Sequence, residues 1–199
     1  APWRRDIFEH YKAKRREGRD TSSTDWEEVF GLIHTIKEEI KENFPYKVVQ
    51  LDNVEADDII AVICKKEFGN EKILIISGDQ EYIWEHILRG DTSDGIPNFL
   101  SPDDTFVNRI KQKPIMKKKL QYWIETLMKG GDAKDFCNEY HLRNFQRNQR
   151  LIDFDFIPDE KEDDIYNTYK NTTVAGRGSI LTYLINNDMK ELIGKIEEF

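Results

Sequence analysis

Three short acidic motifs follow one another in this chain, and their carboxylates are the side chains best suited to chemistry. The motifs are VEADD at residues 54–58, SGDQE at residues 77–81 and GDTSDGIPN at residues 90–98. Together they supply seven carboxylates: Glu55, Asp57, Asp58, Asp79, Glu81, Asp91 and Asp94. Carboxylates that share a cleft repel one another unless cations lie between them, and all-oxygen ligands select hard ions. The pattern therefore predicts a site for Mg²⁺, for which Mn²⁺ can substitute.

Each motif also has a purely structural interpretation. Asp57 and Asp58 would complement a helix dipole, and Asp79 would end a strand. Asp91 and Asp94 would form a polar turn. Three such motifs in one order, beside two basic segments, favour the metal site.

The basic side chains are concentrated in two segments, although the net charge of the chain is −8. Residues 1–20 hold seven basic side chains against four acidic ones. Residues 105–124 hold six basic side chains and no acid: Arg109, Lys111, Lys113, Lys117, Lys118 and Lys119. Local patches of this kind contact phosphates even on an acidic protein.

The elements around the acidic motifs predict an α/β core. Residues 26–40 have helical spacing, which predicts an amphipathic helix with one buried face. Residues 47–51 and 72–77 are typical of strands, the second apolar enough to be buried on both faces, and a helix from 52 to 68 would connect them. Such a right-handed βαβ unit in a parallel sheet places ligands at the carboxyl ends of its strands, where the acidic motifs fall.

The chain beyond Asp94 predicts helices and no clear strand. The helices are expected at residues 113–129, 133–149, 159–171, 179–186 and 188–198. We therefore expect an α/β core with its basic segment at residues 1–95, and a helical region at residues 96–199 that packs on the core.

The composition excludes several protein classes. No apolar run, residues 73–76 included, comes near the roughly 18 residues of a membrane helix. Cys64 and Cys137 lie far apart without metal-ligand spacing, which argues against a disulfide framework and a zinc site. A soluble protein of a reducing cytoplasm is expected.

The ordered motifs resemble those of the 5′ nucleases, a family that includes flap endonucleases and the nuclease domain of bacterial DNA polymerase I. The segment WRRDIFEHYKAKRR, and LIDFDFIPD followed by GRGSILTYL, are similar above all to the RNase H enzymes of T-even bacteriophages. The resemblance spans nearly the whole chain. It implies a PIN-like fold, in which helices flank a parallel β-sheet and a helix-hairpin-helix-like region follows.

The resemblance also implies two metal sites. Glu55, Asp57 and Asp79 match the first site, and Asp58 matches an acid that acts through metal-bound water. Glu81, Asp91 and Asp94 match the second site. Two positions depart from the family, because Glu81 replaces the aspartate usual in phage enzymes and Gly95 stands where many members carry asparagine.

The basic segments acquire roles from the same resemblance. Arg4, Arg5, Tyr11, Lys12, Lys14 and Arg15 match a cationic segment that rises into an arch over the DNA. Tyr11 would stack on a base, and Lys12 and Arg15 would meet the scissile phosphate. Lys111, Lys113, Lys117, Lys118 and Lys119 match a module that grips duplex phosphates and that holds K⁺ in several members. Because few large apolar residues follow Tyr11, residues 4–19 are expected to be mobile without DNA.

The function implied by the resemblance is two-metal hydrolysis of phosphodiester bonds near the 5′ end of DNA and of RNA annealed to DNA. Lys12, Arg15, Asp57 and Asp79 would be the catalytic residues. In phage replication this activity removes RNA primers and flaps, with a single-stranded-DNA-binding protein and a sliding clamp as partners. A monomer in the host cytoplasm is expected.

Two family features are missing from this sequence. No strand bearing an aspartate precedes the WRRD motif, and only eleven residues separate Asp79 from Asp91, where the phage enzymes have a long stretch. A parallel sheet of two strands would leave unpaired edges, so we expect a piece of a longer polypeptide or its ordered portions under continuous numbering. Two other functions remain open, a non-catalytic structure-specific DNA-binding module and a PIN-like ribonuclease.

Overall fold

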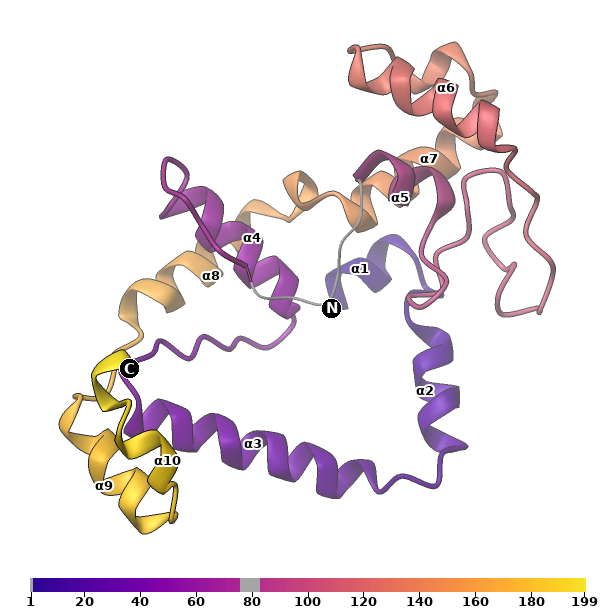
Figure 1. Cartoon of the computed structure of the whole chain (residues 1–199). Coiled ribbons are helices and arrows are strands. Elements are labelled where there is room, and N and C mark those ends of the chain that lie inside the picture. The colour runs from indigo at the N-terminus through magenta and orange to yellow at the C-terminus, as the bar shows by residue number, and fades with distance from the viewer. Residues whose placement is uncertain (1, 76–82) are drawn as a thin grey trace. The chain divides into compact units, whose positions relative to one another are not determined.

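The computed structural model describes residues 2–75 and 83–199 (Figure 1). Asp79 and Glu81, two of the predicted metal ligands, lie outside the described residues. The chain divides into two compact units, each assembled from two stretches of sequence. Unit 1 consists of residues 1–22 and 53–162, and unit 2 consists of residues 23–52 and 163–199.

Unit 1 is built around one long helix, α7 (Glu139–Ile152). The other helices of this unit are α1 (Pro2–Ile7), α2 (Ala13–Asp20), α4 (Ala56–Lys66), α5 (Ile83–Arg89) and α6 (Lys117–Met128), with 3₁₀ turns η1 (Ala133–Asp135) and η2 (Phe154–Phe156). Helix α7 contacts α1, α5, η1 and η2, and α5 also contacts α6. The core between them is aromatic and aliphatic: Phe8, Tyr11, Ile87, Leu88, Phe99, Leu120, Trp123 and Phe145 are all buried.

The sequence of α7 explains both its start and its buried face. The Asn138 side chain caps the helix by accepting a hydrogen bond from the backbone N–H of His141 at 2.8 Å. The buried positions recur at the spacing of one helix face: Asn144, Phe145, Arg147, Asn148, Leu151 and Ile152. Three of these six buried side chains are polar, so this face must provide hydrogen-bond partners as well as apolar packing.

The acidic loop at residues 90–98 leaves α5 through a turn that requires glycine. Gly90 has a φ of +68°, and a Cβ at this position would lie 2.3 Å from the carbonyl oxygen of Ile96. The loop then closes on itself, because Ile96 N donates a hydrogen bond of 2.7 Å to Asp91 O in an isolated antiparallel bridge.

Unit 2 holds α3 (Trp26–Asn43), α9 (Gly178–Asn186), α10 (Lys190–Ile193) and η3 (Ile196–Glu198), and the second part of α8 (Asp159–Asn171), which begins in unit 1. Helix α9 contacts α3 and α10. Tyr183 Oη donates a hydrogen bond of 2.7 Å to Glu39 Oε2, and Ile180 and Leu184 are fully buried. The contact with α3 therefore involves its C-terminal half.

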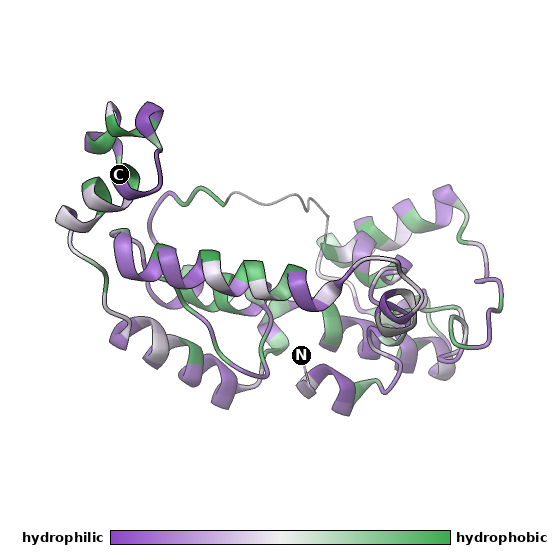
Figure 2. Ribbon diagram, turned by 90° about the horizontal axis from the view of Figure 1, so that it is seen from below, coloured by the Kyte–Doolittle hydropathy of each residue, from purple (hydrophilic) through white to green (hydrophobic). Residues whose placement is uncertain are grey.

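The amphipathic helix predicted at residues 26–40 forms, but the prediction of a buried face is wrong. Asp25 caps α3 by accepting from the backbone N–H groups of Glu27 and Glu28. None of its residues is buried, and Phe30 and Ile33 are 49% and 56% exposed. Figure 2 shows hydrophobic and hydrophilic residues alternating along this helix. Helical spacing creates an apolar face, but burial also needs a partner, and α9 reaches only part of the helix.

The strands predicted at residues 47–51 and 72–77 are not confirmed. Residues 47–51 and 72–75 contain no strand, and Leu74 is 85% exposed rather than buried on both faces. Within the described residues the bridge between Asp91 and Ile96 is the only β-pairing. A strand exists only when a neighbouring strand satisfies its backbone groups, so β-branched composition alone was insufficient.

The predicted helices correspond more closely to the structure. Helix α8 spans the predicted residues 159–171, and α9 begins one residue before the predicted 179. Four predicted helices differ from the structure. The predicted helix 188–198 is divided into the short α10 and the 3₁₀ turn η3. The predicted helix 52–68 is the shorter α4, which is capped at Glu55; the predicted helix 113–129 begins only at Lys117; and the predicted helix 133–149 is interrupted between η1 and α7.

The described helices also bear on the membrane question. None of them combines the length and the hydrophobicity that crossing a lipid bilayer requires. The division into residues 1–95 and 96–199 stays a prediction.

Candidate active site

Four of the seven predicted carboxylates line one cavity of about 1400 Å³ in unit 1. They are Glu55, Asp57, Asp91 and Asp94. Six lysine and arginine side chains line the same cavity: Arg4, Lys12, Arg15, Arg89, Lys111 and Lys113. The structure thus brings together members of the first and third acidic motifs and of both basic segments, which are distant in sequence.

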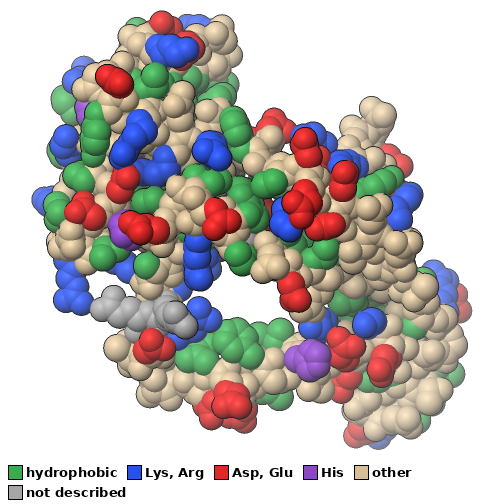
Figure 3. Space-filling view, turned by 180° about the vertical axis from the view of Figure 1, so that it is seen from behind, with side chains coloured by type: hydrophobic (Ala, Val, Ile, Leu, Met, Phe, Trp, Pro, Cys, Tyr) green, Lys and Arg blue, Asp and Glu red, His purple; other side chains and the backbone are tan. Residues whose placement is uncertain are grey.

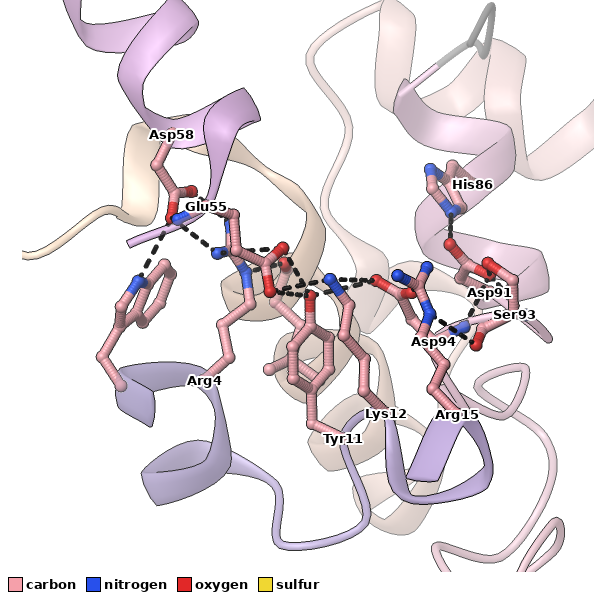
Figure 4. Close-up of polar contacts among 12 residues, drawn as sticks. Arg4, Tyr11, Lys12, Arg15, Glu55, Asp58, His86, Asp91, Ser93 and Asp94 are labelled. Atoms are coloured by element: carbon pink, nitrogen blue, oxygen red, sulfur yellow. Dashed lines mark hydrogen bonds and ion pairs between the residues drawn. The ribbon is translucent and has the colours of Figure 1, made fainter. Parts of the chain in front are cut away.

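Lys12 and Tyr11 connect the two acidic motifs across this cavity (Figure 4). Lys12 Nζ lies 2.7 Å from Glu55 Oε1 and 3.5 Å from Asp94 Oδ2. Tyr11 Oη lies 3.0 Å from Glu55 Oε2 and 3.0 Å from Asp94 Oδ2. Glu55 and Asp94 therefore share one ammonium and one hydroxyl.

Tyr11 does not present its ring for base stacking in this structure. It is 2% exposed, and its hydroxyl faces the two carboxylates. Burial, and then the negative charges of Asp94 and Glu55, raise the pKa of Tyr11 well above its ordinary value. The phenol thus remains a protonated hydrogen-bond donor between the carboxylates.

The surroundings of Glu55 favour its ionised form. Burial alone would raise the pKa of Glu55, but hydrogen bonds and nearby positive charge, with the hydrogen bond from Lys12 the first among them, lower it. Arg15 contacts the other acidic motif, where its Nη2 pairs with Asp94 Oδ1 and its Nε donates to Ser93 O at 3.4 Å.

A close backbone approach holds the basic segment against the acidic loop. Lys12, with a φ of +57°, donates its backbone N–H to Asp94 O at 2.6 Å. Gly95 has a φ of +75°, and a Cβ there would lie 3.2 Å from His10 O. Glycine at this position, where the family often carries asparagine, permits the two segments to pack this tightly.

Asp91 organises its own loop. Its Oδ1 accepts from Ser93 N at 2.7 Å, from Ser93 Oγ at 2.7 Å and from Asp94 N at 3.0 Å. Its Oδ2 lies 3.4 Å from His86 Nε2. Burial opposes ionisation here, yet the contact with His86 and the hydrogen bonds from Ser93 keep the pKa of Asp91 below its usual range. The polar turn that was the structural interpretation of this motif therefore exists, while Asp94 points into the cavity.

Asp58 and Arg4 form a buried pair beside the cavity. Asp58 is fully buried, and Arg4, which is 3% exposed, contacts both Asp58 oxygens at 2.9 and 2.6 Å. Trp3 Nε1 lies 3.4 Å from Asp58 Oδ2, which also accepts from Glu55 N at 3.0 Å. Trp3, Arg4 and Tyr11 are buried, and the mobility expected of residues 4–19 without DNA stays a prediction.

The remaining predicted DNA contacts are exposed. Arg5, Lys14, Lys111 and Lys113 are solvent-accessible, as are the three lysines that begin α6, Lys117, Lys118 and Lys119. Lys14 Nζ lies 4.8 Å from the centre of the Phe106 ring. Basic side chains stand at the surface on the face of the molecule in Figure 3.

The donor types in the cavity suit a hard cation, because its carboxylates offer only oxygen ligands. The described residues nevertheless do not complete a metal site: nowhere among them do three His, Cys, Asp or Glu side chains come together as ligands. Lys12 and Arg15 instead neutralise Glu55 and Asp94.

Two features of this site had not been assigned from the sequence. His86 was given no role but contacts Asp91, and the polar face of α7, with Asn144, Arg147 and Asn148, packs beside the acidic loop. Asn144 and Asn148 are four residues apart on the helix face that also carries Leu151 and Ile152, and this spacing is the signal that the sequence offers.

Comparisons with known proteins cover the whole chain. Residues 1–84 match the family model "5'-3' exonuclease, N-terminal resolvase-like domain", and residues 78–199 match "T4 RNase H, C terminal". The Ribonuclease H of Enterobacteria phage T4 is 31% identical over 231 aligned residues, which cover 99% of this chain and 75% of the relative. The aligned span exceeds the 199 residues of this chain, so the relative has residues within it that this chain lacks.

Proposed function

This chain belongs to the 5′-3′ exonuclease family that includes the RNase H of phage T4, and on that premise we propose that it is a metal-dependent 5′ nuclease. It hydrolyses phosphodiester bonds near the 5′ end of DNA and of RNA annealed to DNA. The observation that carries the proposal is the single cavity lined by carboxylates of two family motifs and by residues of both basic segments.

Glu55, Asp57, Asp91 and Asp94, with Asp79 and Glu81, are the proposed ligands of two Mg²⁺ ions. When bound, such ions neutralise the charge of the phosphate and lower the pKa of a water. The described ligands stand on two rigid supports, the first turn of α4 and the loop that follows α5. The parallel sheet that carries this site in the family remains part of the proposal.

Lys12 and Arg15 are the proposed phosphate-binding cations of the site. In the DNA-free protein they pair with Glu55 and Asp94. A phosphate in the cavity would offer these cations a second anionic partner, with charge that increases as the reaction proceeds. Their position beside the carboxylates supports a role in the chemical step more than in general DNA affinity.

The basic segment before and within α6 is the proposed grip on duplex DNA. Its chain is fixed near the cavity because Asn98 Nδ2 donates to Lys113 O at 2.8 Å and Lys113 N donates to Ser101 Oγ at 2.9 Å. The lysine side chains remain exposed. Phosphate contacts of this kind position a duplex without reading its sequence. A K⁺ ion in this module, and a single-stranded-DNA-binding protein and a sliding clamp as partners in phage primer removal, are proposed from the family alone.

Replacing Lys117, Lys118 and Lys119 together with alanine should weaken binding of all duplex sequences about equally. Each lost phosphate contact should also reduce the slope of log affinity against log salt concentration by roughly 0.9 unit. Fluorescence anisotropy at several salt concentrations measures both effects. Lys134→Ala, which removes a 68%-exposed lysine of unit 1 outside the basic segment, is the control. An unchanged slope in the triple variant would show that its lysines are only solvated.

The proposed function is tested with oligonucleotides labelled at the 3′ end, so that each cut from the 5′ side is counted once. We expect Mg²⁺-dependent shortening of a 5′-flap duplex and of RNA annealed to DNA, and no cleavage in excess chelator. Tight flap binding without cleavage would favour the non-catalytic DNA-binding module. Cleavage of single-stranded RNA alone would favour the PIN-like ribonuclease.

A further inference from the structure

We propose that Asn148 on α7, assisted by Arg147, is a positioning residue that sets where the acidic loop at residues 90–98 stands in the active-site cavity. The proposal rests on the proposed function, because only a nuclease gives the position of Asp94 in that loop a catalytic consequence. Neither Asn148 nor Arg147 lines the cavity.

The loop's internal hydrogen bonds fix its shape but not its place. The bridge from Ile96 N to Asp91 O and the three bonds to Asp91 Oδ1 all connect members of the loop to one another. They would persist if the loop moved as a unit. Its place therefore depends on contacts with the surrounding helices.

Asn148 provides such contacts at both ends of the loop. Its Nδ2 donates to Ile87 O, in α5 just before the loop, and to Pro97 O, near the end of the loop, at 2.9 Å in each case. The side chain is fully buried. Both amide hydrogens are thus used, and Oδ1 accepts from Arg147 Nη2 at 2.8 Å. One side chain on a rigid helix ties the entry and the exit of the loop together.

Arg147 also holds the end of the acidic loop, and it contacts the basic segment as well. Its Nη2 donates to Pro97 O at 3.1 Å, and its Nη1 pairs with Asp103. The guanidinium lies 4.9 Å from the centre of the Phe8 ring, on the segment that leads to Tyr11. Arg147 is only 8% exposed, so these contacts are made away from solvent.

Asn144, one turn earlier on α7, offers an internal control. It is also fully buried, and its Nδ2 also donates to two backbone carbonyls, Phe99 O at 3.1 Å and Ser101 O at 3.0 Å. Those carbonyls lie after the loop. The two asparagines therefore match in burial, helix and number of donated bonds, and differ in whether they hold the acidic loop.

Loss of the Asn148 amide removes the side-chain donor to Ile87 O and one of the two donors to Pro97 O, and the loop is expected to shift. A displacement of about 1 Å at catalytic groups lowers rates by as much as about 100-fold. Asn148→Ala should therefore lower the single-turnover cleavage rate at saturating DNA at least about tenfold, and leave the dissociation constant for the same DNA within about threefold. Asn144→Ala should change the rate by less than about threefold at a comparable loss of thermal stability.

Equal loss of rate in the two variants, in proportion to stability, would overturn the proposal, as would an unchanged rate in Asn148→Ala. If Asn148→Ala does not fold, Arg147→Lys serves in its place. It keeps the charge beside Asp103 but cannot donate to Pro97 O and Asn148 Oδ1 together, and an unchanged rate in this variant would count against the proposal.

Amide hydrogen exchange separates this proposal from the proposed function. Exchange at Lys12, whose backbone N–H donates to Asp94 O of the loop, should be faster in Asn148→Ala than in Asn144→Ala, whether or not the protein cleaves DNA. A wild-type protein without nuclease activity but with this exchange pattern would refute the function and leave the positioning role standing. An active wild type with identical exchange in both variants would refute the positioning role alone.

Discussion

Asp57→Asn is expected to abolish cleavage while DNA binding survives. Asp57 is an exposed carboxylate in the first turn of α4 and lines the cavity. Asparagine keeps the shape of the side chain but removes the charge that would hold a divalent cation. The single-turnover rate should fall by roughly 1000-fold or more, the scale expected for losing a metal ligand.

The alternative interpretation of Asp57 predicts a very different magnitude. If this carboxylate only complements the α4 dipole, its loss costs about 0.3–1 kcal/mol of stability and leaves the rate unchanged. Asp159→Asn is the matched control, because Asp159 is an exposed acid in the first turn of α8 that does not line the cavity. Equal behaviour of the two variants would mean that Asp57 has no catalytic role.

Asp58→Asn is expected to destabilise unit 1 strongly, because it leaves the Arg4 guanidinium buried without its counter-ion. The pair is almost fully removed from solvent. Breaking such a pair from one side typically costs about 3–5 kcal/mol. Urea denaturation measures the change in the free energy of unfolding.

A double-mutant cycle tests whether the pair itself carries this cost. Arg4→Met combined with Asp58→Asn removes both charges and should be less destabilising than the sum of the two single variants. Additive effects, or a loss below about 1 kcal/mol in Asp58→Asn, would contradict a structural role for Asp58. The interpretation of Asp58 as an acid that acts through metal-bound water would then be preferred.

The helices could be predicted from local sequence because the backbone hydrogen bonds of a helix form between residues that are close in sequence. Helix α8 follows Pro158 and carries three acids in its first turn, and these features predict its start without tertiary information. Residues 47–51 and 72–75 had equally clear composition for strands. Their pairing depends on neighbours, which neither β-branched residues nor apolar runs specify.

The acidic motifs predicted which carboxylates line the cavity better than they predicted the ion pairs of those carboxylates. Glu55, Asp57, Asp91 and Asp94 do line one cavity. The sequence did not indicate that Lys12 and Arg15 pair with Glu55 and Asp94, because such pairing depends on the packing of residues 1–22 against the rest of unit 1. A pattern of charges indicates which residues can interact, and burial determines which ion pairs form.

Adjacent residues of the same type can also differ in burial, which the sequence does not indicate. Arg4 and Arg5 are adjacent and were predicted to contact DNA together, yet Arg4 is 3% exposed and Arg5 lies at the surface. Trp3 and Tyr11, which pack with Arg4, draw one face of this segment into the core. The side of a short helix that packs inward cannot be read from a segment of mostly charged residues.

The central claim, that this cavity is a metal-dependent active site, is tested most directly by anomalous diffraction from crystals of the protein soaked in Mn²⁺. The account predicts Mn²⁺ within the cavity, bound by carboxylates among Glu55, Asp57, Asp91 and Asp94, with Lys12 Nζ moved away from Glu55. Crystals of Asp57→Asn should lose this density. Mn²⁺ bound only outside the cavity, or a cavity that stays empty at saturating Mn²⁺ with Lys12 still paired to Glu55, would contradict the account.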